Sequence, residues 1–241
     1  MWTHTEWTTH CNSVVNYFAA NQAILQAALG RAVGMPMLPP PPRTTPTKLL
    51  FIGHSPKLLD DGFFGENAAQ AFVRANNVRY VNGPNAGAAN PQQVHPYYGP
   101  LVSLARCVHP GFGVWWQIDE ARQAQLKVEF TDICHLPCAN DDELRIIWDT
   151  NVVPNFKRQC LTWLQTEIIG IDPDIIVCNG TLASPSLRHL AGMNEPFNPS
   201  EDSPYFQAFG AWIHLSGFMT SARPLDQFNK ARLAKEIREQ M

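Results

Sequence analysis

The stretch KLLFIG, residues 48–53, decides the fold of this 241-residue chain. Its apolar residues run on without alternation, which is typical of a parallel strand that is buried on both faces of a sheet. Three later stretches have the same character: LKVEFTDI at 126–133, DIIVCNG at 174–180 and AWIHLSG at 211–217. We therefore expect four strands in one central sheet.

Helical patterns lie between these strands. In the longest pattern, at residues 153–170, apolar side chains recur at four-residue steps, at Phe156, Cys160, Leu164 and Ile168. Further helical patterns occur at 66–75, 97–108, 184–192 and 224–240. Strands that alternate with helices build βαβ units, in which helices cover both faces of a parallel sheet. The sequence therefore predicts an α/β fold with three layers, α/β/α, around a mainly parallel four-stranded sheet.

The N-terminal part has a different character. Residues 13–30 predict a helix that ends at Gly30, a residue suited to the left-handed position after a helix. Residues 34–47 are rich in proline, which favours an extended strap. We expect the helix and strap of residues 1–46 to pack on a domain formed by residues 47–241.

Composition narrows the class of protein. No apolar run reaches the roughly 18 residues that a membrane span requires, and the N-terminus has no apolar signal-peptide region. A cytoplasmic protein without a membrane partner is expected. The net charge of −3 argues against a broadly basic surface, although a local patch can still contact phosphates.

The six cysteines are scattered along the chain. Cys134 and Cys138 could form half of a metal site, but His4, His10 and Cys11 do not provide a convincing second half. We therefore expect buried thiols and no metal.

Polar or turn-forming residues follow every predicted strand. Ligands of parallel sheets bind at this carboxyl edge, where the connecting loops converge. One interpretation is a small-molecule hydrolase with Ser55 as nucleophile and His214 and Asp132 behind it. A nucleophile elbow needs a small residue two positions after the serine, whereas this chain has Lys57, so the hydrolase is kept only as an alternative.

Taken in chain order, these strand ends resemble the motifs of the uracil-DNA glycosylase superfamily. Residues 50–56 (LFIGHSP) resemble its first motif, a strand followed by Gly-x-x-Pro, and His214-Leu215-Ser216 resembles its second motif, His-Pro-Ser. Between them, residues 130–137 (FTDICHLP) are similar to the segment Thr-Asn-x-x-Lys-Cys-x-Pro, and residues 173–181 (PDIIVCNGT) to a strand and glycine turn. The resemblance covers residues 48–241 and is closest to divergent bacterial members.

The resemblance implies a monomeric enzyme of base-excision repair that binds DNA containing uracil. The enzyme would flip the uracil out of the duplex and hydrolyse its N-glycosidic bond, with no cofactor and no obligate protein partner. Phe64, or Phe63 beside it, would stack on the flipped base, and Asp132 would read its edge. His214 would donate a hydrogen bond to the departing base.

The remaining site residues follow from the same motifs. His54 and Ser55 would hold the attacking water, and Gly53 would let the backbone approach the substrate. Ser216 would contribute to the substrate site. The expected DNA contacts lie after the second motif, with a wedge into the base stack and two phosphate contacts, at Phe218, Met219, Arg223 and Lys230.

The chain departs from the family's motifs at four positions. Neither His54 nor Ser55 is the water-activating carboxylate or amide that family members carry. Asp132 replaces an asparagine, and an ionised carboxylate only accepts hydrogen bonds, whereas an amide also donates them. Leu215 replaces the proline of the second motif.

These departures leave open a further alternative, a member of the fold that binds nucleic acid or a modified base without cleaving it. The cysteine positions do not reproduce the pairs that hold the iron–sulfur cluster of the thermostable branch, which again predicts no metal.

Overall fold

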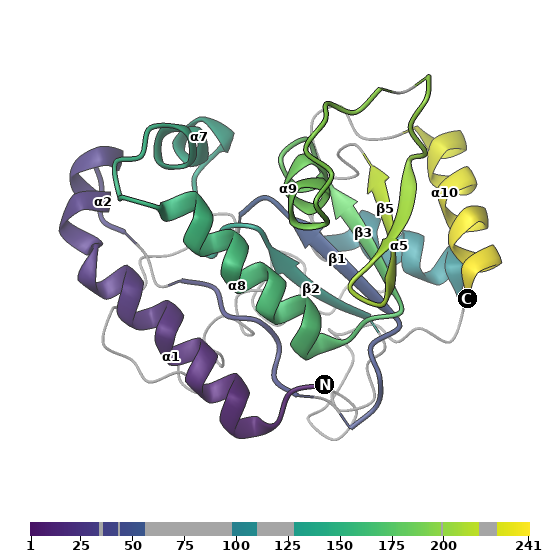
Figure 1. The fold of residues 1–241 in the computed structure, drawn as a ribbon, viewed down its shortest axis with the longest axis horizontal. Coiled ribbons are helices and arrows are strands. Elements are labelled where there is room, and N and C mark those ends of the chain that lie inside the picture. Colours follow the sequence, from purple (N-terminus) through teal and green to yellow (C-terminus); the bar gives the residue numbers. More distant parts are fainter. Residues whose placement is uncertain (34–35, 43, 56–97, 110–127, 199, 217–225) are drawn as a thin grey trace.

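A computed structural model describes residues 1–33, 36–42, 44–55, 98–109, 128–198, 200–216 and 226–241 (Figure 1). A five-stranded sheet runs through the centre of the molecule, in the order β2-β1-β3-β5-β4. Its strands are β1 (Leu49–Gly53), β2 (Val128–Asp132), β3 (Ile175–Asn179), β4 (Tyr205–Ala208) and β5 (Ala211–Ser216). The α/β class is confirmed.

The prediction of a four-stranded sheet was wrong in strand number. β1, β2, β3 and β5 are the predicted parallel strands, and β4 adds an antiparallel edge beside β5. β4 and β5 form a hairpin whose two turn residues, Phe209 and Gly210, both have positive φ angles, of 55° and 79°. Such a turn matches the twist of a hairpin, but phenylalanine is an unusual residue in it, which hid the signal.

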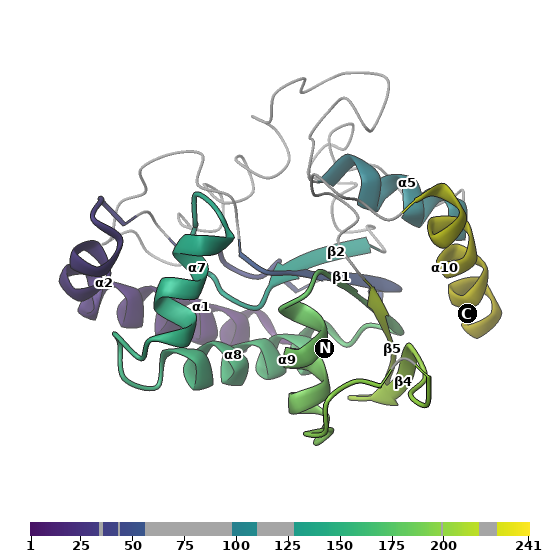
Figure 2. The same ribbon diagram turned by 90° about the horizontal axis from the view of Figure 1, so that it is seen from above.

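Helices cover both faces of the sheet (Figure 2). One layer contains α8 (Phe156–Ile171) and α9 (Ala183–Leu190), with α1 (His4–Ala20) packed beside α8. The other layer contains α5 (Tyr98–Val108) and α10 (Gln227–Gln240), which contact each other. Two short helices, α2 (Gln22–Leu29) and α7 (Asp141–Asp149), pack together at one end. None of the helices in the described ranges is long and apolar enough to cross a bilayer.

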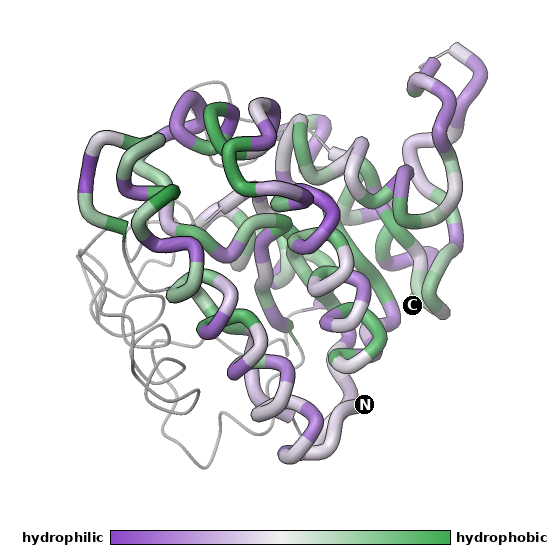
Figure 3. Tube along the Cα trace, turned by 60° about the vertical axis from the view of Figure 1, so that its left-hand side comes forward, coloured by the Kyte–Doolittle hydropathy of each residue, from purple (hydrophilic) through white to green (hydrophobic). Residues whose placement is uncertain are grey.

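Each face of the sheet has its own apolar core. Leu50, Ile52 and Ile176 face α1, α8 and α9, whereas Phe51 and Val177 face α5 and α10. All of them are buried, as expected for central parallel strands. Hydrophobic and hydrophilic residues alternate along the helices in Figure 3, as is typical of helices with one buried face.

The N-terminal helix differs from its prediction. It runs from His4, where Thr3 and Glu6 form a capping box, to Ala20, and after it α2 runs to a left-handed Gly30. The sequence pattern started the helix only at residue 13. The earlier turns also have a buried apolar face, with Trp7 and Cys11 at four-residue spacing, and this spacing and the capping box were the missed signals.

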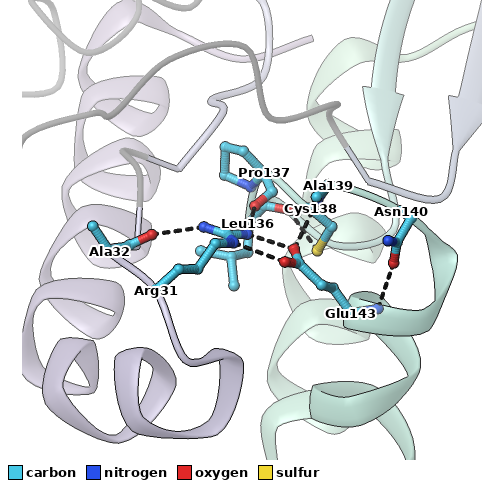
Figure 4. A network of polar contacts seen from close by, with 8 residues as sticks. All are labelled: Arg31, Ala32, Leu136, Pro137, Cys138, Ala139, Asn140 and Glu143. Atoms are coloured by element: carbon cyan, nitrogen blue, oxygen red, sulfur yellow. Dashed lines mark hydrogen bonds and ion pairs between the residues drawn. The ribbon is translucent and has the colours of Figure 1, made fainter.

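The strap after α2 contacts α1 and the segment that follows β2. The indole N–H of Trp7 donates to the carbonyl of Pro39, and the backbone N–H of Met37 donates to the carbonyl of His135. Arg31 binds both carboxylate oxygens of Glu143 in α7, at 2.9 and 2.6 Å (Figure 4). These contacts connect residues 1–46 to the segment between β2 and α7.

Candidate functional site

The carboxyl ends of the parallel strands form one polar layer. Gly53 is the register partner of Asp132, and Asn179 is the register partner of Ser216. Because Ile52 pairs with Cys178, Asn179 follows directly beside Gly53. The layer therefore runs Asp132, Gly53, Asn179 and Ser216 across four neighbouring strands.

The glycine in this layer separates two polar side chains. Asp132 and Asn179 are buried, and the alternation of each strand turns both toward the α5 and α10 face. Their strands flank β1, so their backbones stand about two strand spacings apart, on the order of 10 Å. Gly53 adds no side chain between them. The three positions therefore place a carboxylate on one side of the glycine and a carboxamide on the other.

An aromatic layer lies directly below Gly53 and Asp132 in the sheet. Phe51 and Phe130, each two residues earlier in its strand, are register partners with ring centroids 5.1 Å apart and planes at 20°. Both are buried. The polar layer therefore lies directly above buried, stacked aromatic side chains.

His54 faces the other side of the sheet. Its Nε2 accepts a hydrogen bond of 2.8 Å from the backbone N–H of Leu182, and its Nδ1 lies 3.6 Å from a carboxylate oxygen of Asp141. Burial lowers the pKa of His54, although the charge of Asp141 opposes the shift. The ring is therefore neutral at pH 7, and it fixes the turn after β3 rather than facing Asp132.

Ser55 lies just past the end of β1 and is half-buried. Burial raises the pKa of the Cys138 thiol, and a hydrogen bond from Ser55 partly offsets that effect. The hydroxyl of Ser55 therefore contacts the segment between β2 and α7. Ser55 follows Gly53 of the polar layer by two residues.

His214 lies further from the carboxyl edge of the sheet than the sequence predicted. β5 continues two residues past it to Ser216, and His214 pairs with Val177 and Tyr205 in the layer of Phe51. Its Nε2 is hydrogen-bonded to the side-chain oxygen of Gln240, and its ring lies 5.5 Å from that of Tyr205. Burial lowers its pKa, despite the opposing hydrogen bond. The structure thus does not bring His214 to the polar layer.

This position of His214 weakens the hydrolase alternative. His214 and Phe51 lie at the same level of the sheet, with β3 between their strands, so their backbones are about 10 Å apart. Ser55 lies four residues beyond Phe51, so the separation is larger still. A nucleophile and its base must come within hydrogen-bond reach of about 3 Å, so Ser55 and His214 do not form such a pair.

Several predicted site residues lie outside the described ranges. They are Phe63, Phe64, Phe218, Met219 and Arg223. Lys230 is described and lies in the first turn of α10, half-exposed. α10 runs back along the sheet from the end where β5 finishes, so its first turn is near the carboxyl edge (Figure 1).

Asn179 is the residue that the sequence-based site omitted. The sequence showed that it lies at a strand end, within the segment 173–181, but it carries no titratable group and the motif specifies no residue type at this position. Register supplies the missing information, because it places Asn179 beside Gly53 and level with Asp132. A carboxamide at this point can donate and accept hydrogen bonds.

A hollow of about 590 Å³ opens beside Ser216, on the α9 side of the sheet. Gly180, Thr181 and Leu215 line its inner wall. The guanidinium of Arg188 also borders it and is bound to Asp202 at 3.3 Å. The hollow therefore adjoins the polar layer, and the positive charge of Arg188 at its border is paired with the carboxylate of Asp202.

A second polar cluster lies on the α8 side of β2. Glu167 of α8 is fully buried, accepts a 2.7 Å hydrogen bond from Thr131 and contacts Nε2 of His10 at 2.9 Å. Nε2 of His135 lies 2.7 Å from the same carboxylate oxygen as His10. Burial by itself raises the pKa of Glu167, but the charge of His135 and the hydrogen bond from His10 outweigh it and hold the pKa at about 2.

Comparison with known proteins adds no family assignment. No protein-family model matches the chain, and no curated protein sequence matches it. The function therefore has to be argued from the strand-end residues and their geometry.

Proposed function

We propose that the chain is a DNA glycosylase that flips uracil out of DNA and hydrolyses its N-glycosidic bond. The observation that carries this proposal is the alignment of Asp132, Gly53 and Asn179 in one layer above the stacked rings of Phe51 and Phe130. A flipped base needs polar groups for its edge and a flat apolar surface for its ring. Gly53, Asp132 and Asn179 belong to three of the strand-end segments that resemble the uracil-DNA glycosylase superfamily, whereas His214 of the second motif lies below this layer.

Asp132 and Asn179 together supply the hydrogen bonds that uracil requires. The base presents carbonyl oxygens, which accept, and an N3–H group, which donates. An ionised Asp132 accepts from N3–H, while the amide of Asn179 donates to a carbonyl oxygen. The carboxylate that replaces the family's asparagine is thus compatible with uracil when Asn179 takes over the donor role.

Hydrolysis then depends mainly on stabilising the departing base. The C1′–N1 bond breaks with its electron pair moving to the base, a water oxygen bonds to C1′, and the proton from water leaves with the base or to solvent. Negative charge develops on the base, so a preorganised donor such as the Asn179 amide contributes more than a general base. His54 is unsuited to be that base because its Nε2 already accepts from Leu182.

Ser55 remains the residue that orients the attacking water. It is half-buried, follows β1 directly and has a hydroxyl that can donate and accept. Lys230 and the residues outside the described ranges, Phe63, Phe64, Phe218, Met219 and Arg223, keep their predicted roles in stacking and DNA contact. His214 has a structural role in this proposal, through its hydrogen bond to Gln240 of α10, in place of the donor role expected from its motif.

The proposal is tested with labelled oligonucleotides that contain one uracil, and matched ones that contain thymine. The protein is produced in a host that lacks its own uracil glycosylase, and alkali converts abasic sites into strand breaks. We expect breaks only at uracil. If the DNA is bound in a gel-shift assay but never broken, the alternative of a non-catalytic binding protein of this fold replaces the enzyme.

A further inference from the structure

We propose that His10, His135 and Glu167 bind a divalent transition-metal ion, zinc in the first place, which fastens the N-terminal helix to the sheet. The three residues come from α1, from the segment after β2 and from α8. Their ligand atoms all lie within 4.8 Å of one another. The site is separate from the proposed base pocket, because it lies on the opposite face of β2 from Asp132.

The chemistry of the three groups matches that ion. Two imidazole nitrogens with one carboxylate oxygen are a common zinc ligand set, in which a water completes a tetrahedron. The same set suits other first-row divalent ions, whereas calcium and magnesium prefer oxygen ligands alone. Both imidazole Nε2 atoms already lie close to the same carboxylate oxygen of Glu167.

His135 makes a buried ion pair with Glu167 whose geometry is not that of a hydrogen bond. Its Nε2 lies 2.7 Å from Oε1 of Glu167. Its Nδ1 is also buried and has no hydrogen-bond partner in the described part of the chain. The side chain is only 1% exposed, and a buried polar atom without a partner carries a large desolvation cost. A cation bound by Nε2 and by Oε1 of Glu167 would replace this ion pair by shared ligation.

The distances allow such an ion after a small adjustment. Zinc binds nitrogen and carboxylate oxygen at about 2.0–2.2 Å, so the ligand atoms of a tetrahedral site are about 3.4 Å apart. The two nitrogens now stand 2.9 and 2.7 Å from the oxygen. Each imidazole therefore needs to move outward by about half an ångström, which a side-chain rotation accomplishes.

One outer contact of a metal site is already present. Thr131 donates a hydrogen bond to Oε2 of Glu167, the oxygen that does not contact the histidines, and so fixes the carboxylate. A groove of about 600 Å³ reaches His10 from the surface, and its lining includes Trp2, Thr9 and Ile169. An ion therefore has an entry path to His10.

The test measures zinc in the full-length protein. Chelator-treated protein is incubated with zinc sulfate, passed through a desalting column and analysed for metal by mass spectrometry. We expect about one zinc per chain. Glu167→Gln and His10→Gln are expected to lower retention at least tenfold. His4→Gln, which removes an exposed histidine from the same helix, is expected to leave retention unchanged.

Two measurements keep the test decisive if a variant folds poorly. Cobalt added to the wild-type protein is expected to give the visible absorption bands of a tetrahedral ion, and zinc is expected to raise the melting temperature. A wild-type protein that retains no zinc overturns the proposal. Equal retention by folded Glu167→Gln also overturns it, because the ion would then be bound elsewhere.

Discussion

Gly53 of β1 and Asp132 of β2 are register partners at the carboxyl edge of the sheet, so a residue without a side chain stands beside a buried carboxylate. A bulkier residue at position 53 would add a side chain between Asp132 and Asn179, where the base is proposed to bind. Gly53→Val is expected to lower uracil excision by at least about tenfold, a free-energy change of about 1.4 kcal/mol. Valine favours strands, so the urea midpoint is expected to hold. An unchanged excision rate would show that the base does not bind between Asp132 and Asn179.

The stability of the protein is expected to fall below about pH 6.5, the unfolded pKa of histidine. Burial lowers the pKa of both His54 and His214 in the folded protein. Below pH 6.5 the unfolded chain binds protons that the folded chain does not, so stability is lost as the pH falls from 6.5 toward the folded pKa values. Each histidine contributes a slope of at most about 1.4 kcal/mol per pH unit.

Urea unfolding of the wild type and of His54→Gln/His214→Gln at pH 7.5, 6.5 and 5.5 measures this effect. Glutamine can still accept from the N–H of Leu182, and it does not titrate. The double variant is expected to lose less stability than the wild type between pH 6.5 and 5.5. Parallel curves for the two proteins would contradict the assignment.

The forked contact between Arg31 and Glu143 is expected to stabilise the attachment of the N-terminal part. Arg31 binds both carboxylate oxygens and lowers the pKa of Glu143 (Figure 4). Arg31→Lys keeps the charge but loses the fork, with an expected loss of about 1 kcal/mol in unfolding free energy at pH 7. Arg232→Lys is the control, because that exposed pair is 3.6 Å apart. Equal effects of the two substitutions would count against the fork.

Gly170 allows Trp2 to pack on α8. A Cβ atom at this position would lie 2.0 Å from the indole ring, and the N–H of Trp2 donates to the carbonyl of Gly170. Gly170→Ala is therefore expected to destabilise the protein by about 1–3 kcal/mol, although alanine favours helices. The variant Trp2→Ala/Gly170→Ala removes the clash and is compared with Trp2→Ala alone. If Gly170→Ala destabilises the Trp2→Ala background equally, the clash is not the cause.

The strands and most helices were predictable because their signals are local. Continuous apolar runs define β1, β2, β3 and β5, and four-residue periodicity defines α8. α7 was overlooked although Asn140 caps it and acidic residues fill its first turn. β4 was overlooked because it is short, half-exposed and joined to β5 through a phenylalanine.

The site was predictable only in its position. The rule that ligands bind at carboxyl edges selected Gly53 and Asp132, but the depth of His214 depended on where β5 ends. Asn179 became a site residue through strand register, which a single sequence does not reveal. The cluster of His10, His135 and Glu167 was equally hidden, because its members are far apart in the chain and show no ligand spacing.

Single-turnover release of uracil from labelled DNA is the most direct test of the proposed glycosylase. The protein, prepared from a host without uracil glycosylase, is compared with Asp132→Ala, Asn179→Ala and the exposed control Asn194→Ala. We expect the wild type and the control to release uracil, and the two site variants to be slower by about 10- to 100-fold, as expected for 1–3 kcal/mol of lost hydrogen bonding. No release by the wild type, or release at the same rate by folded Asp132→Ala and Asn179→Ala, would contradict the account.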